Sequence, residues 1–292
     1  AYESILPHKR KKLHLKVARS IEMIFSDRLH EFFGMLAYHY SRAENLEKAE
    51  EYLIKAGEEA LKSSASNEAL NYYQEALKLY SKVYGDQTDP KKVAMLEKNI
   101  ALALYNRGLY DEAVAFFDKS LNYYWGKLPQ NRISTLFKFL SGFLHLLVSL
   151  YLPYFKFKKI PTQSDNEAVD LYFKKLKALA IINPKRFFLE SFHFYKRVSR
   201  FDLSKFDLGI GLFIGASTIF SFSGISFRLS RKILDFVKNK IEKDDIKSLA
   251  IFDFSETLHN FLGGNWKSIK AYDQNLIDKN IDTEIQFKNY SL

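Results

Sequence analysis

One spacing constrains this chain more than any other: a small, a large and a second small residue recur at helical intervals after a short turn. In the stretch 105–121, YNRGLYDEAVAFFDKSL, these residues are Ala113, Phe117 and Ser120. Side chains three and four positions apart lie on one face of a helix, and small ones let a second helix approach closely. Gly108, in the turn before them, favours the left-handed conformation that ends a helix. The stretch therefore predicts half of a packed helix pair.

The same pattern occurs at two earlier places and, more loosely, near the C-terminus. The earlier sets are Ala49, Leu53, Ala56 and Ala69, Tyr73, Ala76. Near the C-terminus Gly264, Trp266 and Ile269 take the positions of Gly108, Tyr110 and Ala113, although Asp273 falls where Phe117 would be. The helices that carry Ala49 and Ala69 follow each other without a complete repeat between them. We therefore expect an irregular array of helix pairs.

These pairs resemble the tetratricopeptide repeat (TPR), an antiparallel helix pair of about 34 residues. The resemblance covers 30–124 and, in a looser form, 244–280. It implies an all-α fold, a right-handed α-solenoid of antiparallel helix pairs with about 12–14 helices. Hydrophobic periodicity predicts helices at 8–25, 28–43, 46–63, 66–82, 91–107, 110–124, 131–152, 166–182, 184–199, 204–222, 226–241, 245–262 and 265–278.

A second resemblance extends over most of the chain. YESILPHKRKKLHLKVARSIE (2–22) is similar to the join between a winged-helix-like end and a first repeat helix in large bacterial signalling proteins with an AAA-type (STAND-like) ATPase module. WGKLPQNRISTLFKFL (125–140) resembles a further landmark of these proteins. In that family the ATPase often follows a nucleotide cyclase or protein kinase domain, and the helical region regulates it.

These resemblances imply three parts: a linker helix from an upstream domain at 1–27, TPR-like repeats at 28–124, and degenerate TPR-like helical repeats at 125–292. The chain starts with Ala1, and no signal peptide follows. We expect it to be part of a longer cytoplasmic protein. Cysteine is absent, which excludes disulfides and thiolate metal sites.

The formal charge is +10, and much of the visible excess lies in HKRKKLHLKVAR (8–19). Leu13, Val17 and Ile21 recur every four residues there, which predicts one buried stripe with a solvated basic face. The alternative, binding to DNA through this run, predicts a steep dependence on salt. Nucleic-acid binding also needs a recognition module, and the sequence contains none that we recognise.

Two apolar stretches, 139–155 and 208–227, are long enough to raise the question of a membrane. The first contains His145 and Pro153, and the second contains four glycines and five hydroxyl residues. We interpret both as buried solenoid helices, with a membrane-associated helix as the alternative. His145 is then expected to be a hydrogen-bonded interior imidazole.

The motifs of common catalytic and cofactor sites are missing. There is no phosphate-binding G-x-x-x-x-G-K-[ST], no G-x-S-x-G, and no H-E-x-x-H among the seven histidines. GIGLFIG (209–215) lacks the glycine spacing of a dinucleotide site. We therefore predict no catalytic, cofactor or metal site, and a non-enzymatic role for this chain.

The densest aromatic patch is RFFLESFHFYKRVSRF (186–201). Aromatics interleaved with Arg and Lys can stack on bases. Phe188, Phe192 and Tyr195, however, are spaced four and three apart, which favours a core stripe.

We predict that the repeats bind a protein, a peptide or upstream domains of the same chain; the oligomeric state stays open. On the concave face, the candidate partner-binding residues are Tyr38, Arg42, Lys98, Leu102, Tyr105 and Asn106. The alternative function is a ligand-sensing domain or an enzyme that uses a pocket in the aromatic-rich segment 131–240.

Overall fold

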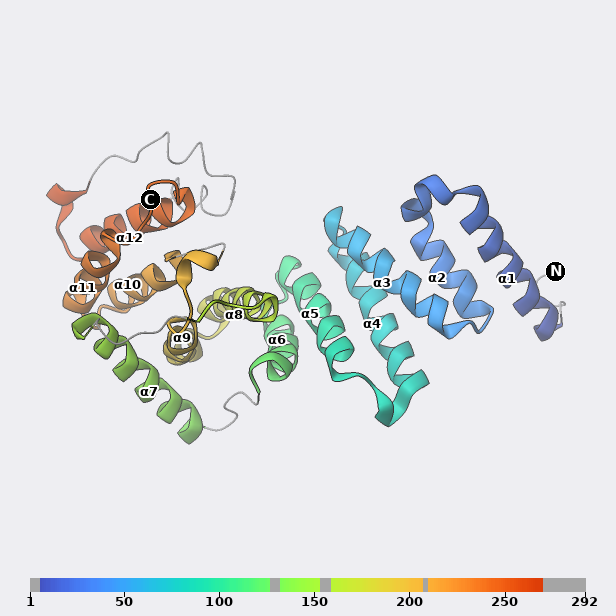
Figure 1. Cartoon of the computed structure of the whole chain (residues 1–292), viewed down its shortest axis with the longest axis horizontal. Coiled ribbons are helices and arrows are strands. Elements are labelled where there is room, and N and C mark those ends of the chain that lie inside the picture. The colour runs from blue at the N-terminus through green and yellow to red at the C-terminus, as the bar shows by residue number, and fades with distance from the viewer. Residues whose placement is uncertain (1–5, 127–131, 153–158, 207–209, 270–292) are drawn as a thin grey trace. The chain divides into compact units, whose positions relative to one another are not determined.

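The computed structural model describes residues 6–126, 132–152, 159–206 and 210–269, and within these ranges it contains twelve α-helices and no strand (Figure 1). The helices are α1 (Pro7–Ile24), α2 (Phe33–Arg42), α3 (Leu46–Lys62), α4 (Ser66–Tyr84), α5 (Pro90–Asn106), α6 (Tyr110–Trp125), α7 (Arg132–Tyr151), α8 (Gln163–Ile182), α9 (Pro184–Val198), α10 (Gly211–Ser223), α11 (Phe227–Lys238) and α12 (Ile246–Leu262). The predicted all-α fold of helix pairs is confirmed.

The chain divides into two compact units. The first contains 1–128 and 171–182, and the second contains 129–170 and 183–292, so the division falls within α8. The first unit packs α1 to α6 each against the next, and the second unit packs α7 on α9 and α10 on both α11 and α12. Each unit is described by itself below.

Three turns of the first unit share one backbone geometry. They join α2 to α3, α3 to α4, and α5 to α6, and their middle residues are Glu44, Ser64 and Gly108, with φ of 59°, 61° and 76°. In each turn the amide of the middle residue donates to the carbonyl three positions earlier, and the next amide donates to the carbonyl five positions earlier. The predicted left-handed Gly108 is confirmed, and two non-glycine residues adopt the same conformation.

Small residues hold these helices together, as their spacing predicts. Ala113, Phe117 and Ser120 are fully buried, and the Ser120 hydroxyl donates to the Ala94 carbonyl oxygen at 2.8 Å. The two earlier sets, on α3 and α4, are also buried. Gly57 of α3 faces the ring of Tyr73 on α4, where a Cβ would come within 2.7 Å of the ring. Helix α3 therefore packs closely against both of its neighbours in sequence.

Contacts between helices that are not consecutive show that the first unit has two layers. A Cβ on Gly34 of α2 would overlap the Tyr72 hydroxyl of α4. The Glu50 carboxylate of α3, which is buried, lies 2.7 Å from the Lys92 ammonium of α5. Helices α2 and α4 thus lie in one layer, and α3 and α5 lie in the other.

The buried stripe of α1 differs from the predicted one. Leu13 and Val17 are exposed, whereas His14 and Ala18 are buried together with Ile21. Ala18 has only a methyl side chain, so α2 can approach closely, and His14 lies 2.8 Å from His39 of α2, measured between their Nδ1 atoms. A polar contact and a small side chain therefore decide which face of α1 packs.

One carboxylate on α1 joins three helices. Glu22 accepts hydrogen bonds of 2.6 Å from the hydroxyl of Tyr40 on α2, the hydroxyl of Tyr52 on α3 and the ammonium of Lys48 on α3. Burial would raise the pKa of Glu22, but these three hydrogen bonds outweigh it and lower the pKa. The carboxylate is thus held ionised at neutral pH.

Phenylalanine side chains form the core of the second unit. Phe192 of α9 is fully buried, and its ring centroid lies 5.1–5.7 Å from those of Phe139, Phe143, Phe188 and Phe220. Phe188 is half-buried and Tyr195 is buried, so the core interpretation of 186–201 is confirmed. Gly142 of α7 lies directly on the Phe192 carbonyl, where a Cβ would overlap the backbone.

Hydroxyl groups connect α10, α11 and α12. Ser230 Oγ is 2.8 Å from Ser217 Oγ, 2.7 Å from Ser221 Oγ and 2.8 Å from His259 Nδ1. All four residues are buried. Each hydroxyl can both donate and accept, so these polar side chains satisfy one another inside the unit.

The end of α12 repeats the turn of the first unit. Gly264 has φ of 75°, and the amides of Gly264 and Asn265 donate to carbonyls three and five positions earlier. The predicted match of Gly264 to Gly108 therefore holds at the level of the turn. Of the helix predicted at 265–278 the structure describes 265–269, where Trp266–Ser268 form a 3-10 helix; the rest, with Asp273, lies outside the described residues.

Two other predicted helices need correction. In 28–43, residues Ser26–Phe32 form a 3-10 helix with a kink at Arg28, and the α-helix begins at Phe33. In 204–222, a 3-10 helix covers Leu203–Lys205, and α10 begins only at Gly211. Phe213, Ile214, Ile219 and Phe220 of α10 are buried, as predicted for the part of 208–227 that the structure describes.

Helix α7 contradicts the prediction of a buried helix at 139–155. Only 22% of the stretch Ile133–Tyr151 is buried, and among the described residues it is the one helix long and apolar enough to cross a membrane. Its exposed large side chains are Ile133, Leu136, Phe137, Leu140, Leu144, Val148, Tyr151 and, just beyond it, Leu152. We call these residues the α7 apolar face. One side of α7 packs on α9, and the other side has an unusual amount of apolar surface for a protein in water.

Candidate functional site

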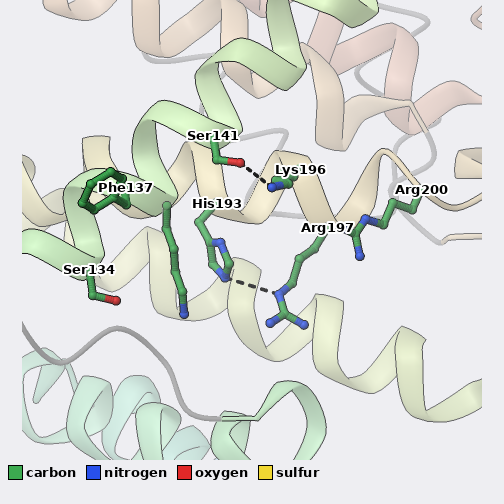
Figure 2. Close-up of a pocket in the computed structure, with 8 residues that line it drawn as sticks. Ser134, Phe137, Ser141, His193, Lys196, Arg197 and Arg200 are labelled. Carbon is green, nitrogen blue, oxygen red and sulfur yellow. Dashed lines mark hydrogen bonds between the residues drawn. The ribbon is translucent and has the colours of Figure 1, made fainter.

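A cavity of about 500 Å³ lies beside α7 and α9, within the second unit (Figure 2). Ligand pockets for small molecules typically measure about 300–1,000 Å³. The lining residues of α7 are Ser134, Phe137, Lys138 and Ser141, and α9 and the residues after it contribute His193, Lys196, Arg197 and Arg200. Each set has the spacing i, i+3, i+4, i+7, so each comes from a single helix face.

Hydrogen bonds fix several of these side chains. The Lys196 ammonium donates to the Ser141 hydroxyl, which connects α9 to α7. Arg197 Nε donates to His193 Nε2 at 3.3 Å, which makes that imidazole nitrogen an acceptor (Figure 2). The Arg200 backbone lies beside the isolated parallel bridge between Lys159 and Phe201, and its carbonyl accepts from the Lys159 amide at 2.9 Å. The cavity is therefore built by positioned side chains.

The cavity has a strong excess of positive charge. Four of its eight lining residues are Lys or Arg, and none is acidic. Helix α7 contains no acidic residue, and the single one in α9, Glu190, accepts a 2.6 Å ion-pair contact from Arg186. Burial, and then the nearby charge of Arg197, lower the pKa of Lys138. An anion in the cavity would relieve this repulsion between cations.

His145 lies on α7, close to the end of α9. Its Nε2 atom is 2.7 Å from the Ser199 hydroxyl, and the imidazole is half-buried. The predicted hydrogen-bonded imidazole is confirmed, although its position is less interior than expected.

The predicted partner-binding residues fall into two groups. Tyr38 and Arg42 lie on α2, where the Arg42 guanidinium stacks 5.4 Å above the Tyr38 ring and the ring is half exposed. Lys98, Leu102, Tyr105 and Asn106 lie on α5. Because α2 and α5 belong to different layers, the structure does not bring the two groups together.

Within the second group, only Asn106 is fully exposed; Lys98, Leu102 and Tyr105 are half-buried. The Tyr105 ring packs edge-on against Tyr110 and Phe117 of α6, at 5.4 Å and 6.2 Å. Tyr105 therefore contributes mainly to the α5–α6 contact. The role of all six residues in binding stays a prediction.

The buried Ser–His cluster of α10, α11 and α12 also pairs a hydroxyl with an imidazole. Ser230 Oγ lies 2.8 Å from His259 Nδ1, but Ser230 is fully buried and a substrate could not reach it. Burial, and then the charge of Arg231, lower the pKa of His259 despite nearby Glu256 and Asp235. The cluster therefore packs α10, α11 and α12. Among the described residues no group of His, Cys, Asp and Glu side chains could hold a metal ion.

Sequence reasoning missed the cavity and the α7 apolar face. The signal for the cavity was present in 186–201, where the basic residues have the same helical spacing as the aromatic residues but lie on a neighbouring face. The partner helix face on α7 has Ser and Lys at matching intervals. The two faces form one cavity only because α7 packs on α9. Helix α8 separates these two helices in the sequence, so no local pattern predicts their contact.

One family model, described as a tetratricopeptide repeat, matches residues 99–124. The match covers the second half of α5, the Gly108 turn and α6, which supports a TPR-like helical region. No curated protein and no solved structure matches the chain.

Proposed function

We propose that this chain is a non-catalytic, cytoplasmic protein-interaction and regulatory domain of a larger bacterial signalling protein with an ATPase module and an associated cyclase or kinase. TPR-like helical repeats commonly bind proteins, and the repeat at 99–124 gives the coarse part of this function. The signalling context is supported by the resemblance of 2–22 and 125–140 to such proteins.

The observation that carries the proposal is the α7 apolar face. Contiguous apolar surface on a folded protein marks a site of interaction. The face follows one side of a helix of 20 residues, and Phe137 and Leu144 on it are 68% and 60% exposed. A partner that buries an amphipathic helix or an extended apolar segment there would remove this surface from water.

Affinity purification with the whole chain as bait tests this function. A variant with Leu136, Leu140 and Leu144 replaced by Gln removes apolar area from the face without touching the packed side. A matched control replaces the exposed Phe222 and Ile225 of the same unit by Gln. We expect the first variant to lose the partner and the second to keep it. Capture that is the same for both variants would contradict the proposal.

A second candidate function is supported by the cavity beside α7 and α9. It lies inside the segment 131–240, for which the sequence predicts a ligand-sensing domain or an enzyme as the alternative. The serine–amine pair in the lining is Ser141 with Lys196, and there the ammonium donates to the hydroxyl and cannot take its proton, so ligand sensing fits the cavity better than catalysis. A ligand that binds only the folded chain would raise its melting temperature.

A further inference from the structure

We propose that the cavity beside α7 and α9 binds a compound that carries two or more phosphate groups. This proposal rests on the second candidate function above and names its ligand class. The argument uses the charge of the cavity, the hydrogen-bonding groups that line it and its size.

The charge of the lining matches a multiply charged anion. Lys138, Lys196, Arg197 and Arg200 face one cavity, and no lining residue is a carboxylate. Two phosphate groups carry about three to four negative charges at neutral pH, since each has a second pKa near 6.

The lining offers mainly hydrogen-bond donors. Lysine and arginine donate and cannot accept, and the serine hydroxyls of Ser134 and Ser141 can rotate to donate. The one imidazole acceptor, His193 Nε2, already accepts from Arg197. A neutral ligand rich in donors would find few partners here. Phosphate oxygens accept only, and Arg binds them through two parallel hydrogen bonds.

The structure also restricts the size of the ligand. A volume of about 500 Å³ is suited to a small molecule or a headgroup. Helices α7 and α9 are held at close distance where Gly142 meets the Phe192 backbone, so the two halves of the cavity have a fixed spacing. Phe137 and the imidazole of His193 are the two aromatic rings in the lining, which is too few for a path along stacked bases of a nucleic acid.

The phosphate groups could come from a soluble compound or from a lipid headgroup. Phe137 belongs to both the cavity lining and the α7 apolar face. A lipid-linked phosphate could therefore lie in the cavity while its chains contact Leu136 and Leu140. The experiment needs one arm for each source.

The test uses the whole chain at constant ionic strength. In the first arm, isothermal titration measures binding of inorganic pyrophosphate. In the second, sedimentation measures binding to phosphatidylcholine vesicles with and without phosphatidylinositol bisphosphate. Both arms compare Lys196→Gln and Arg200→Gln with Arg228→Gln, an exposed arginine on α11 that is outside the cavity lining.

We expect each cavity variant to weaken binding about tenfold, which is about 1.4 kcal/mol, and Arg228→Gln to leave it unchanged. This pattern with pyrophosphate supports a soluble ligand, and the same pattern only with the bisphosphate vesicles supports a lipid headgroup. No binding in either arm, or an equal loss in Arg228→Gln, would overturn the proposal. Arg200 is exposed, so its variant is informative even if Lys196→Gln fails to fold.

The result is independent of the protein-interaction function. Partner capture that depends on the α7 apolar face can succeed while both phosphate arms fail, and the reverse is equally possible. Each proposal can therefore be rejected without the other.

Discussion

The first unit packs its helices through alanine and glycine, whereas the second packs through phenylalanine and uses serine between its last helices. In the first, Ala49, Ala69 and Ala113 let neighbouring helices come close, and the same turn geometry occurs three times. In the second, Phe192 gathers four other rings around it. Small residues at repeated positions give the first unit the same helix packing several times, whereas the cluster of large rings gives the second unit a single core.

This difference explains why a large exposed apolar face is found in the second unit. Close packing of small residues buries most of the apolar area of α3 to α6. The ring cluster faces one side of α7 and leaves the α7 apolar face in water. The second unit, whose packing is not repeated, thus has both the exposed α7 apolar face and the positively charged cavity.

The largest effect should follow from removal of the central ring of the second unit. Phe192→Ala would leave a cavity among four aromatic side chains and is expected to cost about 3–5 kcal/mol of unfolding free energy. Hydrogen exchange read by mass spectrometry should show lost protection in α7, α9 and α10. If α2 to α6 lose protection equally, the two units do not unfold independently and the comparison fails.

A smaller effect should distinguish the close approaches in the two units. A Cβ on Gly142 would overlap backbone atoms of Phe192, while a Cβ on Gly57 would meet the ring of Tyr73. Gly142→Ala should therefore separate two helices and cost roughly 1–3 kcal/mol. Gly57→Ala should cost less, because a ring can shift while a helix backbone cannot. Denaturant midpoints of both variants are measured side by side, and a loss in Gly57→Ala that equals or exceeds the loss in Gly142→Ala would contradict this prediction.

The repeated turns should respond by about 1 kcal/mol in opposite directions. Gly108→Ala places a Cβ at φ of 76°, with nothing within 4 Å of it, so the cost is one of backbone conformation alone. Ser64→Gly removes the same strain from an equivalent turn and should stabilise the first unit. Thermal unfolding of the two variants and of the double variant measures this. Equal destabilisation by both would mean that the turns are not equivalent.

The smallest effect concerns pH and the contact of His14 with His39. Burial lowers the pKa of both below 6.5, with a further contribution from Arg42 for His14 and from His14 for His39. The unfolded chain therefore binds more protons as pH falls below 6.5, and the stability of the first unit should decrease in that window. His39→Gln should make the decrease shallower.

Trp125 can report on this unit, because its ring packs 5.1 Å from Tyr172 within it. Unfolding midpoints followed by Trp125 fluorescence in a Trp266→Phe background should fall between about pH 7.5 and 5.5. Glu22 contributes only at lower pH, since its pKa is lowered from 4.5. A midpoint that is the same at both pH values would show that His14 and His39 do not make the stability of the first unit depend on pH.

Most of the first unit could be predicted from its sequence because its signals are local. Gly108 and the set Ala113, Phe117 and Ser120 lie within one turn and one helix, and each behaves as its spacing indicates. The stripe on α1 was predicted one position away, because hydrophobicity favours Leu13 and Val17 while packing selects Ala18 and a histidine contact.

The candidate cavity could not be predicted, since its two halves lie on α7 and α9 with a whole helix between them in sequence. Lys138 and Arg200 read locally as solvated charges. They line one cavity only because Gly142 lets α7 and α9 pack closely against each other. The apolar content of α7 was visible, but which half of it faces water depends on where the five rings gather.

Helix α4 has a consequence for any comparison of this chain with other repeat proteins. It stands between the pair α2–α3 and the pair α5–α6, so the first helix of each pair falls in a different layer. Residues at equivalent repeat positions on the two sides of α4, such as Tyr38 and Leu102, are therefore not equivalent in space. The residues of a binding site from a regular solenoid can therefore be introduced within one helix pair. If they were placed on both sides of α4, they would lie in different layers.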